Sequence, residues 1–197
     1  MVRIGCVFAV VFVAFLFSSC GWQSIPMAKN QVEATVAEVT NQYKRRADLI
    51  PNLVAVVKGY ASHEKETLQA VVEARANATK AEINPASMSP QQIEQFMKAQ
   101  GSLSQALGRL MVIVEKYPDL KADANFRELQ AQLEGTENRI TIARQRHIEA
   151  IKAFNDLVAV PPTSWTNSLL YHHEKMPQWT LSDEEKKSAE APPKVQF

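Results

Sequence analysis

Residues 32–60 read VEATVAEVTNQYKRRADLIPNLVAVVKGY, and apolar side chains recur in this stretch at two positions of a seven-residue repeat. A helix with two such seams packs lengthwise against neighbouring helices. The pattern predicts one long helix that begins near Pro26 and ends at Asn84, because the residue before Pro85 is disfavoured in helical conformation. The first seam consists of Val36, Tyr43, Ile50, Val57 and Val71, and the second of Val32, Val39, Leu53 and Tyr60.

Pro51 lies in the middle of this pattern. A proline inside a helix removes one backbone hydrogen bond and crowds the carbonyl group four residues earlier, here that of Ala47, at a cost of about 3 kcal/mol when nothing compensates. The two seams nevertheless keep their phase on both sides of Pro51. We therefore predict a kinked but continuous helix. The alternative is a break between Leu49 and Asn52.

A second helix is indicated by its cap. Ser89 at the N-cap, Pro90 at the first helical position and Gln92 three residues after the cap form a capping box. This helix is predicted to end at Tyr117, because Pro118 cannot continue it. Its apolar face consists of Ile93, Phe96, Leu103, Leu107, Leu110, Val114 and Tyr117.

A third helix follows, with Asp119 or Asp123 as its N-cap, since an aspartate accepts hydrogen bonds from the free N–H groups of a first turn. Pro161 and Pro162 end it. Its seams contain Phe126, Leu133, Ile140, His147 and Phe154, beside Leu129, Thr136, Ala143, Ala150 and Leu157.

Three long helices with short connections predict an all-α fold, an antiparallel up-and-down bundle over residues 26–179. The composition agrees, because only 6 of the 197 residues are glycine and a glycine-poor chain favours helices over turn-rich sheets. A short C-terminal helical segment, residues 163–179, is expected to cover one end of the bundle with its apolar side chains. Residues 180–197 are rich in Glu, Lys, Ala and Pro and are predicted to form a disordered tail.

Residues 1–19 have the plan of an export signal peptide. Arg3 precedes an apolar run over residues 4–17, which is shorter than the about 20 residues that a membrane-spanning helix needs. We therefore expect cleavage. The alternative is an uncleaved membrane anchor that runs from Val2 to about Trp22.

Cys20 is the expected site of lipidation. Ser18 and Ser19 directly precede it and resemble a bacterial lipobox, a signal in which the cysteine is acylated and becomes the first residue of the mature chain. Phe17 departs from that pattern, which usually has an aliphatic residue three places before the cysteine. With cleavage before Cys20, residues 20–25 form a tether between the lipid and the bundle.

Charge and cysteine content exclude some classes of partner and site. The net charge is +1, whereas a nucleic-acid-binding protein needs an excess of Lys and Arg on one face. We therefore expect no nucleic-acid partner. Besides Cys20, the chain contains only Cys6, which would leave with the signal peptide, so the bundle is predicted to hold no disulfide.

Arg46 and Glu64 are charged residues at seam positions of the first helix. A buried charge is costly unless it is paired and hydrogen-bonded. We expect Glu137 or Glu134 to face Arg46, and Arg139 or Arg109 to face Glu64, because each candidate carries the opposite charge and lies on another helix. Arg46, Glu64, Glu137 and Arg139 would then form a structural polar seam. The alternative is a polar groove that binds a ligand.

No catalytic or metal-binding motif is complete in the sequence. His63 and Glu64 begin like a helical zinc motif, but Thr67 stands where the second histidine is required. His147 lies on a seam and is expected to be a core residue, while the adjacent His172 and His173 point in different directions if helical. The chain has no glycine-rich phosphate loop and no nucleophile beside a base. We therefore expect no enzyme activity, no metal and no cofactor.

Several separated blocks resemble the LemA family. They are RRADLIPNLV at 45–54, VKGYASHE at 57–64, YPDLKA at 117–122 and LEGTENRI at 133–140. The resemblance implies a bacterial, membrane-associated helical bundle on the non-cytoplasmic side, without a settled catalytic activity or ligand. Two features depart from the family: Cys20, where members usually have an uncleaved membrane helix, and His147-Ile148, where they tend to have Tyr-Asn. The chain is thus expected to be a lipoprotein-like variant.

Two hypotheses for function follow. In the first, the chain is a membrane-tethered scaffold of the bacterial cell envelope, on the periplasmic face in a Gram-negative cell, which contacts an envelope protein through helical surfaces. In the second, it is a small-ligand carrier or an enzyme that uses polar residues of the bundle. A deep pocket that contains Arg46, Glu64 and a histidine would favour the second hypothesis.

Overall fold

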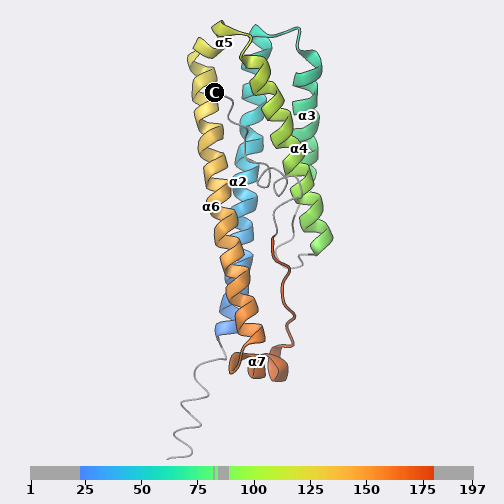
Figure 1. The fold of residues 1–197 in the computed structure, drawn as a ribbon, viewed down its shortest axis with the longest axis vertical. Helices are drawn as coiled ribbons and strands as arrows, with labels where there is room; N and C mark the ends of the chain where they lie inside the picture. Colours follow the sequence, from blue (N-terminus) through green and yellow to red (C-terminus); the bar gives the residue numbers. More distant parts are fainter. Residues whose placement is uncertain (1–22, 82, 84–88, 180–197) are drawn as a thin grey trace, which may run out of the picture.

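The computed structural model describes residues 23–81, 83 and 89–179, and every regular element in this part of the chain is helical, as predicted. Two helices run the length of the molecule, and two others cover one half of it (Figure 1). In chain order the elements are α2 (Ser24–Tyr60), α3 (Lys65–Lys80), α4 (Pro90–Val114), α5 (Pro118–Ala122), α6 (Ala124–Ala159), α7 (Thr163–Thr166) and the π-helical turn η1 (Asn167–Tyr171).

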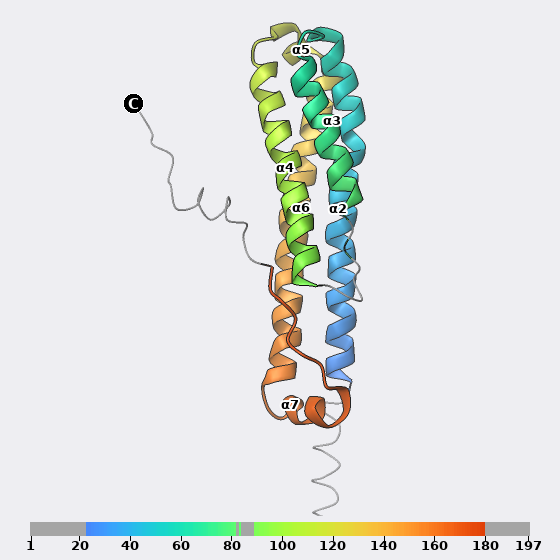
Figure 2. The same ribbon diagram turned by 90° about the vertical axis from the view of Figure 1, so that its right-hand side faces the viewer.

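The long helices α2 and α6 lie side by side and antiparallel, and α3 packs against α4 and α2 (Figures 1 and 2). The α2–α3 connection and α5 lie at one end of the bundle, which we call the α5 end. The beginning of α2, the end of α6 and α7 lie at the other, which we call the α7 end. The chain therefore runs up, down, up and down in the half next to α5, whereas α2 and α6 alone continue to α7.

The prediction of one helix from Pro26 to Asn84 is wrong. The chain leaves the helix at Ala61, turns through Ser62 and His63, and starts α3 after Glu64, so that the bundle has four long helices where three were predicted. The N–H of Glu64 donates to the carbonyl of Ala61 over 3.1 Å, which closes the turn. Gly59 and Ser62 flank the break, and both are weaker helix formers than alanine.

The helix α2 continues through Pro51 without a break, as predicted. Because Pro51 has no N–H, the carbonyl of Ala47 lacks its normal helical donor. The side chain of Arg75 on α3 supplies a replacement: its Nε donates to that carbonyl over 2.7 Å. The proline that weakens α2 thus creates a point at which α3 binds to it.

Both long helices that follow α3 begin at a predicted N-cap. The cap of α4 is Ser89, and of the two candidates for α6 the structure has Asp123. The hydroxyl of Ser89 accepts from the N–H of Gln92, and the N–H of Ser89 donates to the Gln92 side chain, both over 3.2 Å. Asp123 caps α6 and accepts from the N–H of Phe126 over 2.9 Å. Asp119 instead lies in the short helix α5.

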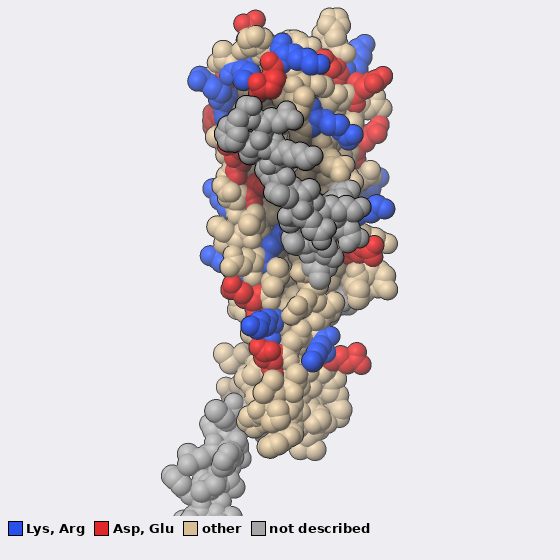
Figure 3. Space-filling model, viewed as in Figure 1, with Lys and Arg blue, Asp and Glu red and all other residues tan. Residues whose placement is uncertain are grey.

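The C-terminal segment is helical over residues 163–171 and lies at one end of the bundle (Figure 1), as predicted, but three of the apolar side chains expected to cover that end are exposed. Trp179 is buried, but Trp165, Leu169 and Leu170 are 68%, 77% and 50% exposed. The chain after η1 leaves the α7 end and runs back along the bundle to Trp179 (Figures 1 and 2). On the face shown in Figure 3, the α7 end is formed by uncharged residues, whereas charged side chains are spread over the rest.

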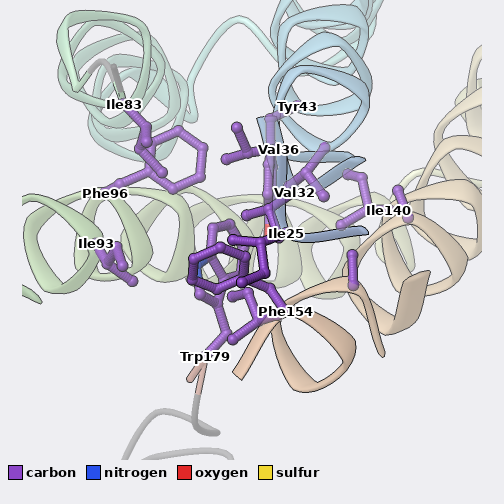
Figure 4. Packing of buried hydrophobic residues seen from close by; sticks show 14 residues of the cluster. Ile25, Val32, Val36, Tyr43, Ile83, Ile93, Phe96, Ile140, Phe154 and Trp179 are labelled. Atoms are coloured by element: carbon purple, nitrogen blue, oxygen red, sulfur yellow. The ribbon is translucent and has the colours of Figure 1, made fainter. Parts of the chain in front are cut away.

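The hydrophobic core consists of two clusters. The cluster nearer the α7 end includes Val32, Phe96, Phe154 and Trp179, and Figure 4 shows how α2, α4, α6 and the C-terminal segment contribute to it. The cluster nearer the α5 end joins apolar residues of α2, α3, α4 and α6, together with Leu120 of α5. The chain changes from one cluster to the other between Tyr43 and Ile50 on α2, between Phe96 and Leu103 on α4, and between Leu133 and Ile140 on α6.

The predicted signal peptide or anchor, Cys20 and the predicted disordered tail at 180–197 lie outside the described residues. The helix α2 begins at Ser24, inside the predicted 20–25 tether, and Ile25 is already buried. Within residues 23–81 and 89–179, no helix is both long and apolar enough to span a membrane.

Candidate functional site

A layer of buried polar side chains separates the two hydrophobic clusters. Arg46 of α2, Gln100 of α4 and Thr136 of α6 are 3%, 5% and 0% exposed. Each occupies a seam position of its helix, at the point where the flanking seam residues change from one cluster to the other. Thr136 donates to the carbonyl of Gln132 on its own helix over 2.7 Å, so that Arg46 and Gln100 remain to bond across the bundle.

Arg46 is held by acceptors from two helices. Its Nη1 donates to Glu137 Oε2 over 2.9 Å and to Ser104 Oγ over 3.0 Å. Its Nη2 donates to the Gln100 side chain over 2.9 Å and to the Gln100 carbonyl over 3.3 Å. The guanidinium also lies over the Tyr43 ring, 5.1 Å from the centroid. Arg46 Nε has no hydrogen-bond partner among the described residues.

The charge of Arg46 is buried, but that of its partner is not. Glu137 is 56% exposed at its side chain, so water screens the ion pair from one side. The remaining acceptors are neutral, and they replace the water that the guanidinium loses on burial. Arg46 is therefore fixed in position mainly by the four hydrogen bonds of its two terminal nitrogens, with one acidic partner at the surface.

Gln100 extends this network to α3. Its Nε2 donates to the carbonyl of Ala78 over 3.2 Å, and Ala78 lies in the last turn of α3. The carbonyl groups at a helix end have no partner within the helix and need an external donor when buried. The contacts of Arg46 and Gln100 together join α2, α3, α4 and α6 at one height of the bundle.

An open groove lies next to Arg46, between α4 and α6. It has a volume of about 270 Å³ and opens to solvent. The backbones of α4 and α6 approach each other at few points, which leaves this side of the four-helix part less tightly closed. We call it the α4–α6 groove, and it is lined by Arg46, Ser104, Leu107, Met111, Gln130, Leu133, Glu134 and Glu137.

The structure brings Arg46 and Glu137 together, and Glu134, the other acidic candidate, lines the same groove. It places Glu64 elsewhere. Glu64 stands at the turn before α3 and accepts a hydrogen bond from the hydroxyl of Tyr117 over 3.1 Å. Desolvation first, and then this hydrogen bond, raises the pKa of Tyr117.

The predicted pairing of Glu64 with Arg139 or Arg109 is wrong. Both arginines are exposed on the surface. Arg139 lies 15 residues after the beginning of α6 at Ala124, which places it about 22 Å from the α5 end at 1.5 Å per residue, whereas Glu64 is at that end. Because the helix breaks at Ala61, Glu64 is not on a seam and does not need a buried partner.

The histidines lie apart from Arg46. His147 is fully buried in the cluster nearer the α7 end, where its Nδ1 is hydrogen-bonded to Thr35 Oγ1 over 2.9 Å. The centroid of its ring lies 4.8 Å from that of Trp179. Burial lowers the pKa of His147 to about 4. His63 and His172 are exposed. No group of three or more His, Cys, Asp or Glu residues is arranged to hold a metal ion in the described part of the chain.

Sequence reasoning missed the neutral members of the network. Gln100 interrupts the apolar face of α4 between Phe96 and Leu103, and this interruption was a usable signal for a buried polar residue. Ser104 gave no such signal, because it follows a seam position. Outside the network, Arg75 also gave none, because it belongs to a helix whose neighbours depend on the turn at Ala61. Their roles become visible only when the helices are placed side by side.

The family comparison is consistent with these features. The model of the LemA family matches residues 35–197, which include α2 from Thr35 onward, the other three long helices, the polar layer and the α4–α6 groove. No curated protein matches the chain. Since the match covers most of the sequence, the chain belongs to the LemA family.

Proposed function

We propose that the protein is a membrane-tethered scaffold of the bacterial cell envelope, without catalytic activity, that binds a partner protein through the α4–α6 groove. The observation that carries this proposal is the groove itself: it is open, its apolar side chains are Leu107, Met111 and Leu133, and Arg46 is fixed at its edge. Pre-formed apolar depressions beside fixed polar groups are the usual anchor points of protein interfaces.

The size of the groove favours a protein partner over a small molecule. Pockets for drug-sized ligands usually measure about 300–1,000 Å³ and enclose most of the ligand, whereas this groove has about 270 Å³ and is open. It suits one or two apolar side chains from a partner helix or loop. The carrier or enzyme alternative needed a pocket with Arg46, Glu64 and a histidine, and these residues lie at different heights of the bundle.

The charges around the groove indicate the chemistry of the partner. Glu134 and Glu137 are exposed at its rim, and Glu137 already has one partner in Arg46. A basic residue next to the inserted apolar side chain would pair with Glu134 at the rim. The same acidic rim repels phosphate groups, so this surface favours a protein partner over nucleic acid.

The tether follows from the sequence before α2. The apolar run at 4–17 and the Ser18-Ser19-Cys20 triplet support attachment to the envelope membrane through an acylated Cys20.

Labelling cells with a palmitate analogue, followed by fractionation, tests this attachment for the wild type and Cys20→Ala. We expect a labelled membrane protein that loses its label on substitution. Label that survives the substitution would overturn lipidation, and wild-type protein in the soluble fraction would overturn tethering.

In-cell crosslinking followed by mass spectrometry tests the groove. We compare the wild type with Leu107→Glu, which places a charge in the groove, and with Val112→Glu, a control at a 67% exposed position on the same helix. Circular dichroism checks that both variants are folded. The proposal expects a reproducible envelope partner with the wild type and the control, but not with Leu107→Glu. Equal recovery with all three proteins would contradict it.

A further inference from the structure

The α7 end exposes a group of large apolar side chains. Met27 at the start of α2 and Val160 after α6 are 66% and 55% exposed, and Trp165, Leu169 and Leu170 are 68%, 77% and 50% exposed. Trp165 and Leu169 are four residues apart in continuous helical structure, so they lie on the same side. An exposed apolar group on a folded protein commonly marks a surface that contacts a membrane or another protein.

The two segments that carry these side chains contain no charged residue, and the nearest charged residues in the sequence are Lys29, Asp156 and Glu174. Residues 159–171 read AVPPTSWTNSLLY and residues 23–28 read QSIPMA, with no Asp, Glu, Lys or Arg in either segment. The face of the molecule in Figure 3 agrees, because its α7 end is uncharged. Protein interfaces usually have a polar rim with charges, whereas Thr166 and Ser168 between Trp165 and Leu169 suit the neutral, hydrated headgroup region of a bilayer.

The position of this surface identifies the bilayer it would meet. The helix α2 begins at Ser24 at the same end as α7 (Figures 1 and 2). Residues 18–23 separate Ser24 from the apolar run at 4–17, and six residues span at most about 20 Å when fully extended. An anchor formed by that run, or a lipid on Cys20, therefore holds the α7 end close to the membrane surface.

We propose that the α7 end contacts the lipid bilayer, with Trp165, Leu169 and Leu170 inserted into the headgroup region of the membrane that holds the tether. This inference rests on the tether of the proposed function. The inserted side chains form a second attachment beside the tether, so that the long axis of the bundle stands away from the membrane. Because the inserted side chains are uncharged, their contact requires no anionic lipid, in contrast to surfaces that bind through basic residues.

Fluorescence quenching by lipids with brominated acyl chains tests this contact. The full-length protein is reconstituted in vesicles of zwitterionic phosphatidylcholine, with or without bromine. The chain has three tryptophans; Trp22→Phe removes the one next to the anchor, and Trp179 is buried in the core. We compare Trp22→Phe with Trp22→Phe/Trp165→Phe. We expect brominated vesicles to quench the first protein and to leave the second almost unquenched.

A matched control places a tryptophan at the other end of the molecule. Val112 is 67% exposed and lies two residues before the end of α4, near the α5 end. In the Trp22→Phe/Trp165→Phe background, Val112→Trp is expected to remain unquenched. All substitutions of described residues are at exposed positions, which leaves the folded structure intact. Equal quenching from positions 112 and 165 would overturn a specific contact of the α7 end.

Flotation of the vesicles on a density gradient separates this proposal from the tether. Protein that floats but whose Trp165 is not quenched would overturn the bilayer contact and leave the tether standing. Another protein, or a second copy of this chain, would then bind the α7 end. Protein that is quenched without floating stably would overturn the tether alone. Protein that neither floats nor is quenched would overturn both.

Discussion

Arg46 illustrates how a single buried charge is accommodated in a helical core. Neutral oxygens from Gln100 and Ser104 accept three of its hydrogen bonds, and the exposed Glu137 accepts the fourth. Such a polar layer costs desolvation energy compared with an apolar one, but it favours one register of the helices, because a shifted register would separate the terminal nitrogens of Arg46 from these acceptors.

Replacing Arg46 tests this role. Arg46→Met removes the charge together with its hydrogen bonds and leaves the buried side-chain oxygen of Gln100 without its donor, so we expect the free energy of unfolding to fall by about 1–3 kcal/mol. Arg45→Met is the matched control: the neighbouring arginine is exposed, and its replacement should change stability by less than about 0.5 kcal/mol. Urea denaturation measures both.

Glu137→Gln completes the comparison at this site. The amide oxygen still accepts from Arg46, and the pair is screened by water at the exposed Glu137 side, so we expect a loss below about 1 kcal/mol. If Arg46→Met left stability unchanged but abolished partner binding, Arg46 would have a role in recognition alone, and the structural role would be wrong.

His147 provides a prediction for pH. Its pKa is about 4 in the folded protein, compared with 6.5 for an unperturbed histidine, so the unfolded chain takes up a proton at higher pH than the native state does. Above about pH 7, His147 is neutral in both states and does not lower the free energy of unfolding. As the pH falls towards 4, the free energy of unfolding decreases, and below pH 4 His147 causes no further change.

Measured by urea denaturation, the wild type should lose about 2 kcal/mol more stability between pH 7 and pH 5 than His147→Gln does. Glutamine has no proton to gain and retains polar atoms near Thr35, which bonds His147 in the wild type. Parallel pH dependence of the two proteins would show that His147 is protonated equally in both states, contrary to its burial.

At the scale of the helices, the contact between Pro51 and Arg75 is open to a double-mutant cycle. In the wild type, Arg75→Met removes the donor to the Ala47 carbonyl and should cost about 1 kcal/mol. In Pro51→Ala, the new N–H of residue 51 donates to the same carbonyl, so Arg75→Met should cost less. The predicted coupling is about 1 kcal/mol. An equal cost in both backgrounds would mean that Arg75 does not compensate for the proline.

Much of the element structure was predictable from local chemistry. The caps at Ser89 and Asp123 and the continuity of α2 through Pro51 depend on residues within a few positions, and they agree with the structure. The turn after Tyr60 was not predicted. Val57 and Val71 are two heptads apart, so the seam stays in phase across the turn although the chain reverses there. Periodicity alone does not distinguish a continuous helix from two helices joined in phase.

The site was predictable only in part for a related reason. Heptad positions indicate which side of a helix faces the core, and this identified Arg46 and its partner Glu137. They do not give the relative heights of residues on different helices. Heptad positions therefore do not reveal that Glu64 and Arg139 are far apart, with Glu64 at the α5 end and Arg139 about 22 Å along α6.

At the scale of the whole molecule, the proposed membrane contact and the proposed partner site are separated along one axis. Arg46 lies 22 residues after the start of α2 at Ser24, which places the near edge of the α4–α6 groove about 33 Å from the α7 end. If the α7 end rests on the bilayer, the groove stands clear of the lipid headgroups. We therefore expect its partner to be a protein with a domain that extends a similar distance from the membrane.

The most direct test of the central proposal, a partner-binding groove between α4 and α6, is photo-crosslinking in cells from two adjacent positions of α4. A photoreactive phenylalanine derivative replaces Met111, which lines the groove, or Val112, which is exposed beside it. The proposal predicts a discrete adduct with one envelope protein from position 111 and none from position 112. Adducts of equal yield from both positions, or none from position 111, would contradict it.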